Sequence, residues 1–216
     1  MRATFRHTPR ALRGAAALFA AAALALLTLP ADRASAVPLT TEYKAASFDE
    51  AAAAPSFIRF HMTDTKLGMF TVSFDGYVKS FALDANVDGT QADGVQLHFP
   101  VRALDTDVGM RNDKMFDYCL AADQHPTIVV ALQGPVTLDG STQVVPALLT
   151  VRGKAHPVQV KVAIAEQGES YLVQGGTTLS LSGLEIPDPS IAIATVKDAV
   201  QVHFKIIVPK TALVKA

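Results

Sequence analysis

Most of the chain alternates apolar and polar residues with a period of two. Clear examples are Val95–Phe99, Val158–Ile164 and Val200–Ile206, where apolar side chains recur at every second position. This period is typical of strands in an antiparallel sheet that buries one face. The pattern predicts about ten strands, at Glu42–Asp49, Ser56–Met62, Gly68–Phe74, Tyr77–Ala85, Val95–Val101, Thr127–Leu132, Val144–Val151, Val158–Ala165, Tyr171–Ser182 and Ala199–Val208.

Turn-forming pairs occur between and within these runs. Asp75-Gly76, Asp88-Gly89 and Asp93-Gly94 are Asx-Gly pairs, which supply the positive φ of tight hairpins. Gly175-Gly176 interrupts one long run, and paired glycines in a strand mark a bend or a bulge. Short strands at this spacing favour a sandwich or a barrel.

One segment lacks the alternation and predicts a short helix across the sheet. In Asp107–Ala122, residues such as Met115 and Cys119 recur at helical spacing, and the segment starts with acidic residues. The alanines of Ala51–Ala54 are interpreted as a connection, because Pro55 follows directly and disfavours helical backbone before it.

The first 36 residues have the composition of a cleavable export signal. Four arginines and no acid precede the apolar run Ala15–Leu29, and the small triplet Ala34-Ser35-Ala36 follows it. The run is shorter than the roughly 20 residues of a membrane-spanning helix, so a signal peptide is favoured over an uncleaved anchor. No arginine pair precedes the run, which favours Sec-type export. We therefore expect one periplasmic domain from Val37 to Ala216.

Without this segment, the chain is acidic and has one cysteine. The segment holds five arginines and one acid, which leaves a formal net charge of −5 for residues 37–216. Such a charge argues against a nucleic-acid partner. A lone cysteine cannot form an internal disulfide. The apolar neighbours of Cys119 favour a buried thiol over a reactive one or an intermolecular bridge.

The chain carries no motif typical of an enzyme. It lacks the G-x-S-x-G elbow, the H-E-x-x-H helix and a phosphate-binding glycine loop. His61, His98 and His203 fall on the polar faces of strands, but no pair has the spacing of metal ligands. Asp105-Thr106-Asp107 resembles part of a calcium loop, yet an acidic turn that caps the helix is favoured. We therefore predict no catalytic residue, no metal and no cofactor.

The apolar faces of the strands would converge on one interior if the sheet curls into a barrel. Roughly eight strands enclose a space that side chains fill or that a ligand occupies, and alternation alone does not decide between the two. The residues predicted to face this lumen are Phe60, Met62, Phe70, Phe74, Leu97, Phe99, Met115, Val160, Val162, Val202 and Phe204.

An ordered set of motifs resembles the YceI-like family of periplasmic, lipocalin-like proteins. The best match, LLTVRGKAHPV, is similar to a strand–turn–strand motif of that family, and FDGYV is similar to an early hairpin. The matching segments are Phe74–Val78, Gly109–Met115, His125–Ile128, Leu148–Val158, Ser182–Ile186 and Val196–Val200. The family's opening histidine is missing between Asp49 and Ser56, and so is the aromatic residue before Gly183.

The resemblance implies an antiparallel, lipocalin-like β-barrel with one short helix that binds a polyisoprenoid, an isoprenoid quinone or a similar lipid. Arg111 and Lys114 are candidates for contact with the ligand's head group at the mouth of the lumen, and a solvated helix face is the alternative. Two other functions stay open. One is a filled barrel that acts as an interaction module, with a membrane protein as a possible partner, and the other is an enzyme.

Overall fold

The computed structural model describes residues 36–212, so the predicted export signal lies outside the described residues except for Ala36, and so do residues 213–216. The strands are β1 (Val37–Lys44), β2 (Phe57–Lys66), β3 (Phe70–Val78), β4 (Ser80–Asp88), β5 (Gln91–Pro100), β6 (Leu104–Asp105), β7 (Thr127–Leu132), β8 (Val136–Thr137), β9 (Gln143–Val151), β10 (Lys154–Gln167), β11 (Ser170–Ser180), β12 (Ala194–Val196) and β13 (Ala199–Pro209). The helices are α1 (Phe48–Ala53) and α2 (Gly109–Lys114), with the short turns η1 (Val101–Ala103), η2 (Met115–Cys119) and η3 (Lys210–Ala212).

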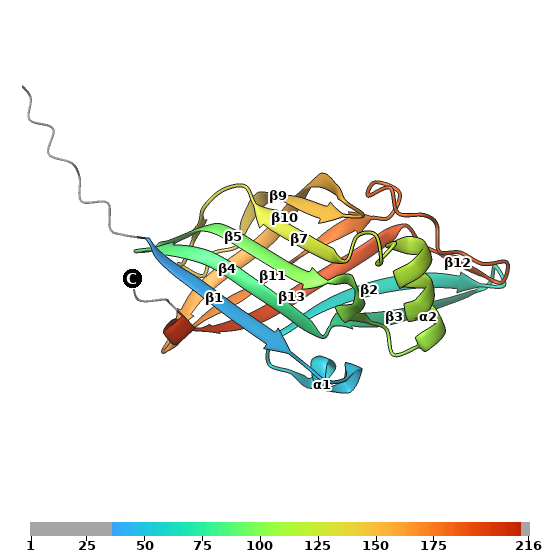
Figure 1. The fold of residues 1–216 in the computed structure, drawn as a ribbon, viewed down its shortest axis with the longest axis horizontal. Coiled ribbons are helices and arrows are strands. Elements are labelled where there is room, and N and C mark those ends of the chain that lie inside the picture. Colours follow the sequence, from blue (N-terminus) through green and yellow to red (C-terminus); the bar gives the residue numbers. More distant parts are fainter. Residues whose placement is uncertain (1–35, 213–216) are drawn as a thin grey trace, which may run out of the picture. The chain divides into compact units, whose positions relative to one another are not determined.

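These strands form one curled antiparallel sheet. Its order is β1-β4-β5-β7-β9-β10-β11-β13-β2-β3-β6, and β8 and β12 pair with β5 and β2. In Figure 1, β4, β5 and β7 cross in front of β10, β11 and β13. The ends of the sheet meet at a corner, where the Lys79 carbonyl accepts from Ala45 N–H and Lys79 N–H donates to Ala103. The predicted lipocalin-like β-barrel is therefore confirmed.

The first strand and the helix after it differ from the prediction. β1 ends at Lys44, before the predicted end at Asp49, because Ser47 begins α1. Ser47 Oγ accepts from Glu50 N–H at 3.2 Å, and the Glu50 carboxylate accepts from Ala46 N–H at 2.7 Å. This reciprocal cap starts a helix. The interpretation of Ala51–Ala54 as a mere connection is wrong, because Pro55 ends the helix at Ala53 without preventing it.

Two of the predicted turns lie inside strands. Asp75-Gly76 is part of β3, which runs on to the corner at Lys79, so Phe74–Val78 is one strand and not a hairpin. Glycine is needed at residue 76 because the ring of Phe60 lies against it. Asp93-Gly94 lies in β5, at a shift in the register of β4 and β5. A glycine between apolar runs can therefore mark close packing or a bulge as well as a turn.

The predicted helix Asp107–Ala122 is present as α2, which continues into the wider turn η2. The acidic turn before it does not cap the helix as expected, because the N-cap residue is Val108 and no side chain bonds to the free N–H groups; the turn instead anchors the helix through Asn112. Asn112 Nδ2 donates to Asp105 Oδ1 at 2.8 Å, and Asn112 Oδ1 accepts from Thr106 N–H and Oγ1. The pKa of Asp105 lies below its usual value. Burial alone would raise this pKa, but the hydrogen bonds from Lys79, Asn112 and the Asp107 N–H stabilise the carboxylate more strongly.

The hairpin between β9 and β10 holds the other end of this helix. Arg152 and Gly153 form its turn, both with positive φ. Arg152 Nη1 donates to the carbonyl of Cys119 at 2.7 Å and to that of Tyr118 at 3.3 Å. A guanidinium is favourable at a helix C-terminus, where carbonyl groups lack partners. The RG pair of the LLTVRGKAHPV motif thus fixes the helix to the barrel.

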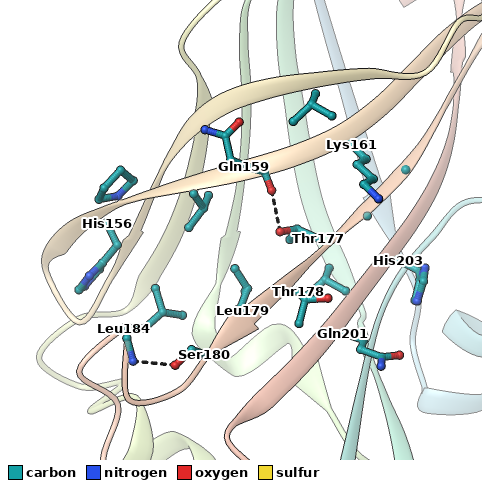
Figure 2. Close-up of a pocket in the computed structure, with 17 residues that line it drawn as sticks. His156, Gln159, Lys161, Thr177, Thr178, Leu179, Ser180, Leu184, Gln201 and His203 are labelled. Atoms are coloured by element: carbon teal, nitrogen blue, oxygen red, sulfur yellow. Dashed lines mark hydrogen bonds between the residues drawn. The ribbon is translucent and has the colours of Figure 1, made fainter.

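β10 and β11 separate along part of their length. Their ladder ends at Lys161 and Gly176, and beyond this point β11 pairs with β13 while β10 pairs with β9. At the point of separation, Thr177 Oγ1 donates to the Gln159 carbonyl at 2.7 Å, the dashed line between these residues in Figure 2. The paired glycines thus mark the place where the sheet divides.

Candidate functional site

The barrel encloses a cavity of ≈ 540 Å³. It is bordered by β2, β3, β5, β7 and β9 to β13, and the helix α2–η2 covers one end. The side chains that line it are apolar except for Asp64, Thr106, Arg111, Lys114 and Thr177. Volumes of 300–1,000 Å³ with mainly apolar walls are typical of small-molecule sites. One part of the barrel interior is therefore a hollow lumen.

Most of the residues predicted to face the lumen line this cavity. They are Phe60, Met62, Phe74, Leu97, Phe99, Met115, Val160, Val202 and Phe204. Phe60, Phe99 and Val160 are buried, and the others are half-buried because one side of each faces the empty volume. Their contact with a ligand stays a prediction.

Two of the predicted lumen residues do not line the cavity. Phe70 lies at the tip of the β2–β3 hairpin and is 60 % exposed, because the hairpin extends beyond the barrel. It points to the same face of β3 as Phe74, but at this height there is no lumen to face. Val162 is buried among core side chains, at a level of the barrel where the interior is filled. Parity assigns a face of the sheet, but not a depth along the barrel.

The two basic residues predicted for the head group both border the cavity. Arg111 lies over the ring of Phe74, with its guanidinium carbon 3.8 Å from the ring centroid. Lys114 Nζ donates to the carbonyl of Ser190 at 3.2 Å. Both side chains are half-buried, so they belong to the rim of the lumen and not to a fully solvated helix face.

Asp64 is a lining residue that the sequence analysis missed. It follows Ile58, Phe60 and Met62 on the inward face of β2, and its Oδ1 is buried without a hydrogen-bond partner among the described residues. A buried acceptor without a partner is costly, which is why such atoms mark candidate ligand contacts. The signal was present in the sequence, because a carboxylate breaks the apolar face of this strand.

Cys119 lies in the wall of the same cavity. Its side chain is buried, as its apolar neighbours predicted. Burial raises the pKa of its thiol, and the charges of Lys114 and Arg152 offset part of this effect. A thiol in this setting has little thiolate character, so it acts as part of the apolar wall.

A larger concavity, of ≈ 970 Å³, lies at the gap in the wall where β10 and β11 separate, and it shares Val158, Thr177, Leu179, Leu184 and Val202 with the lumen. Figure 2 shows Gln159, Lys161, Gln201 and His203 among its lining residues. Leu184 is buried and borders both this groove and the lumen. The groove carries more polar side chains than the lumen, so a long apolar molecule gains more by entering the lumen.

Two of the three histidines predicted on polar strand faces have local partners. His61 Nδ1 lies 2.8 Å from Asp75 Oδ1, and His98 Nδ1 lies 3.5 Å from Asp84 Oδ2. Within residues 36–212, no group of three or more His, Cys, Asp or Glu side chains could hold a metal ion. In the same range, no helix is both long and apolar enough to cross a bilayer.

The fold and the cavity define a lipocalin-like β-barrel with an apolar lumen. Residues 48–208 match the sequence model of the YceI-like domain, so the chain belongs to the YceI-like family, as its motifs predicted. No curated protein matches the chain in sequence.

Solved structures of the same fold include three named proteins. BcnA of Burkholderia cenocepacia has a TM-score of 0.57 and 21% identity, over 69% of this chain and 95% of BcnA. A polyisoprenoid binding domain from Saccharophagus degradans has a TM-score of 0.53 and 16% identity, over 81% and 98% of the two chains. The Campylobacter jejuni YCEI protein has a TM-score of 0.53 and 10% identity, over 62% and 83%. At these identities the likeness concerns the fold.

Proposed function

We propose that this protein is a carrier that holds one long apolar amphiphile in the barrel lumen, a polyisoprenoid, an isoprenoid quinone or a similar lipid. The observation that carries the proposal is the ≈ 540 Å³ cavity with almost entirely apolar walls. The solved polyisoprenoid binding domain of the same fold supports this ligand class. The open volume argues against the alternative of a filled barrel that serves only as an interaction module.

The energetics of burial allow tight binding. Removing ~600 Å² of ligand surface from water is worth ~15 kcal/mol at ~25 cal/mol per Å². Association and ordering cost ~4–15 kcal/mol of this, which leaves room for micromolar to nanomolar affinity. An apolar tail forms no hydrogen bonds, so we expect loose selectivity along the tail and more selectivity at the head group.

The polar end of the lumen supplies groups for that head group. Arg111 and Lys114 offer hydrogen-bond donors with positive charge, and Asp64 offers an acceptor without a partner among the described residues. A head group with acceptor oxygens and at least one hydroxyl would satisfy both kinds of group. Phosphorylated and hydroxylated isoprenoids meet this requirement.

We propose a binding protein and not an enzyme, without a metal or a cofactor. The mainly apolar lining supports this proposal. Apolar side chains make dispersion contacts along a long ligand, and they supply few polar groups that could take part in a reaction. The absence of enzyme motifs from the sequence agrees with it.

We also propose export to the periplasm through cleavage after Ala36. The charged start, the short apolar run and the small triplet support this assignment. The mass of the intact protein from the periplasmic fraction should match a chain that begins at Val37. A full-length chain that stays with the membrane fraction would refute the cleavage.

The carrier function is tested by looking for lipid in the protein purified from its own host. Native mass spectrometry should show a bound species that organic solvent releases, and the apo protein should then take up a long-chain polyprenol. A protein that carries no extractable lipid and takes up no polyprenol would overturn the carrier function in favour of an interaction module.

A further inference from the structure

The end of the barrel next to α2 exposes large apolar side chains. We define the apolar rim as Leu67, Met69, Phe70, Met110, Ile191 and Ile193, each of which is more than half exposed. Met110, at 86 %, and Met69, at 74 %, are the most exposed of these. Single exposed apolar residues are normal on a protein surface, but a contiguous group marks a binding surface.

Backbone contacts join the segments of the rim. Leu67 N–H donates to the Ile193 carbonyl at 3.0 Å, and Lys66 pairs with Ala194 where β12 extends the edge of β2. Figure 1 shows the β2–β3 hairpin and β12 projecting past α2 at one end of the barrel. These contacts join the β2–β3 hairpin to the loop before β12, and Met110 at the start of α2 borders the same cavity as Ile191 of that loop.

The rim continues into the lumen. Met110 and Ile191 border the cavity as well as the outer surface, and Val108 and Pro189 line the cavity beside them. A lipid tail that leaves the cavity over these residues would meet apolar side chains at the opening. This continuity distinguishes the rim from other exposed apolar residues, such as Ile207 on β13.

The turn at the tip of the hairpin has an unusual residue. Leu67 has a φ of +50° and precedes Gly68, which also has a positive φ. In such turns Asn or Asp normally stands before Gly, because a larger side chain is strained in this backbone conformation. Leu67 is nevertheless present and 65 % exposed. Neither backbone preference nor burial explains it, whereas contact with an apolar phase would.

The charges around the rim are of both signs. Lys66 and Lys197 lie beside the hairpin tip and the loop before β12, but Asp64, Asp188 and Asp198 adjoin the same segments, and Asp107 and Asp113 lie on either side of Met110. An apolar tip bordered by charged residues fits the interface of a bilayer, where apolar side chains insert and charged side chains stay among the head groups. A soluble partner of acidic character would not need six exposed apolar side chains.

We propose that the apolar rim docks on the surface of a lipid bilayer, inserts its tip among the head groups, and places the mouth of the lumen against the membrane. The ligand then moves between bilayer and lumen without crossing water. The transfer step rests on the proposed carrier function, whereas the docking step does not.

The test is flotation with vesicles of phosphatidylethanolamine and phosphatidylglycerol. It uses residues 37–216, the chain that remains after the proposed cleavage. The rim variant carries Leu67→Asn, Met69→Gln and Phe70→Thr, and Asn suits the backbone of residue 67. The matched control carries Val144→Thr, Leu148→Thr and Ile207→Thr, which are also exposed apolar positions but lie on outer strand faces.

We expect the unmodified chain and the control to float with the vesicles, and the rim variant to bind at least about tenfold more weakly. All three should keep the same melting curve within a few degrees. Equal binding by the rim variant, or no binding by the unmodified chain, would overturn the proposal.

Two further readouts separate the alternatives. A concentration-dependent dimer in sedimentation that the rim variant abolishes would assign the rim to a second copy of this chain and overturn docking on a membrane. Lipid extracted from the unmodified chain, together with no binding to vesicles, would overturn the docking proposal and leave the carrier function intact. Loss of vesicle binding by a rim variant that still holds lipid would support both the docking proposal and the carrier function.

Discussion

A Cβ atom on Gly76 would lie 2.0 Å from Cζ of Phe60, so the Phe60 ring occupies the space that a side chain on β3 would take. The two residues are direct partners in the β2–β3 ladder. Because the ring lies against the backbone of Gly76, it borders the cavity as part of the wall. The missing side chain of one residue therefore helps to keep the lumen open.

Gly76→Ala should push the Phe60 ring away from the wall and into the cavity. We expect a loss of about 1–3 kcal/mol in the free energy of unfolding and a smaller amount of bound lipid. Thermal melting and quantification of extracted lipid measure the two effects. Gly134→Ala is the control, because a Cβ at Gly134 meets no atom within 4 Å. Equal lipid content in the two variants would contradict this role of Gly76.

Val202→Trp tests whether the lumen is hollow in solution. Val202 borders the cavity from β13, so the larger ring should enter empty volume and displace ligand. We expect a nearly unchanged melting temperature and a marked loss of bound lipid. In a filled interior, overpacking would cost about 1–3 kcal/mol and lower the melting temperature by several degrees. His203→Trp, on the opposite face of the strand, should leave lipid content unchanged.

Arg111→Gln should change the choice of head group and not the binding of the tail. The substitution removes the charge next to Phe74 at the lumen mouth and keeps a polar side chain there. Affinity for a polyprenyl phosphate should fall by about tenfold, which corresponds to one lost charged hydrogen bond of ~1.4 kcal/mol. Affinity for the uncharged polyprenol of the same length should hold, as competition binding will measure. An equal loss for both ligands would assign Arg111 to packing of the mouth.

Cys119 should not form a disulfide-linked dimer, and a bulky maleimide should label it slowly in the native state. Labelling should accelerate at least about tenfold on unfolding, because burial withholds the thiol and raises its pKa. A raised pKa in the folded state stabilises the fold below about pH 8.5, and this contribution is lost as the pH rises through the folded pKa. Cys119→Ala should remove that part of the pH dependence. A reducible dimer on gels would contradict the burial of the thiol in solution.

The class of the fold was predictable because it depends on local periodicity. Alternation in segments such as Val200–Ile206 requires strands with one buried face, and most of the strand centres lie where the pattern placed them. The predicted turns and connections were wrong where one residue type, such as glycine or alanine, is compatible with two local structures. Gly76 and Gly94 serve close packing and a bulge within strands, and the alanines before Pro55 form a helix once Ser47 and Glu50 cap it.

The residues of the lumen were partly predictable for the same reason. Parity identified the inward face, which is why Phe60, Phe74 and Phe204 line the cavity. It could not place Phe70 beyond the barrel or Val162 in the filled part, because both depend on how far each strand extends past its neighbours. Asp64 was overlooked because an acidic residue in an alternating run is typical of the end of a buried strand, and the predicted strand ended at Met62.

Local pattern alone predicted that this chain forms amphipathic antiparallel strands, that a helix follows Asp107, and which family its motifs belong to. These features follow from the period of side chains along a strand and from local turn and capping chemistry. The three-dimensional arrangement of the strands was needed to learn that part of the interior is hollow, that Arg111 meets Phe74 at its mouth, and that exposed apolar residues gather beside that opening. A cavity is the difference between the volume that the curled sheet encloses and the volume that its side chains fill. That difference depends on how strands from the whole chain are placed in space, so no local pattern records it.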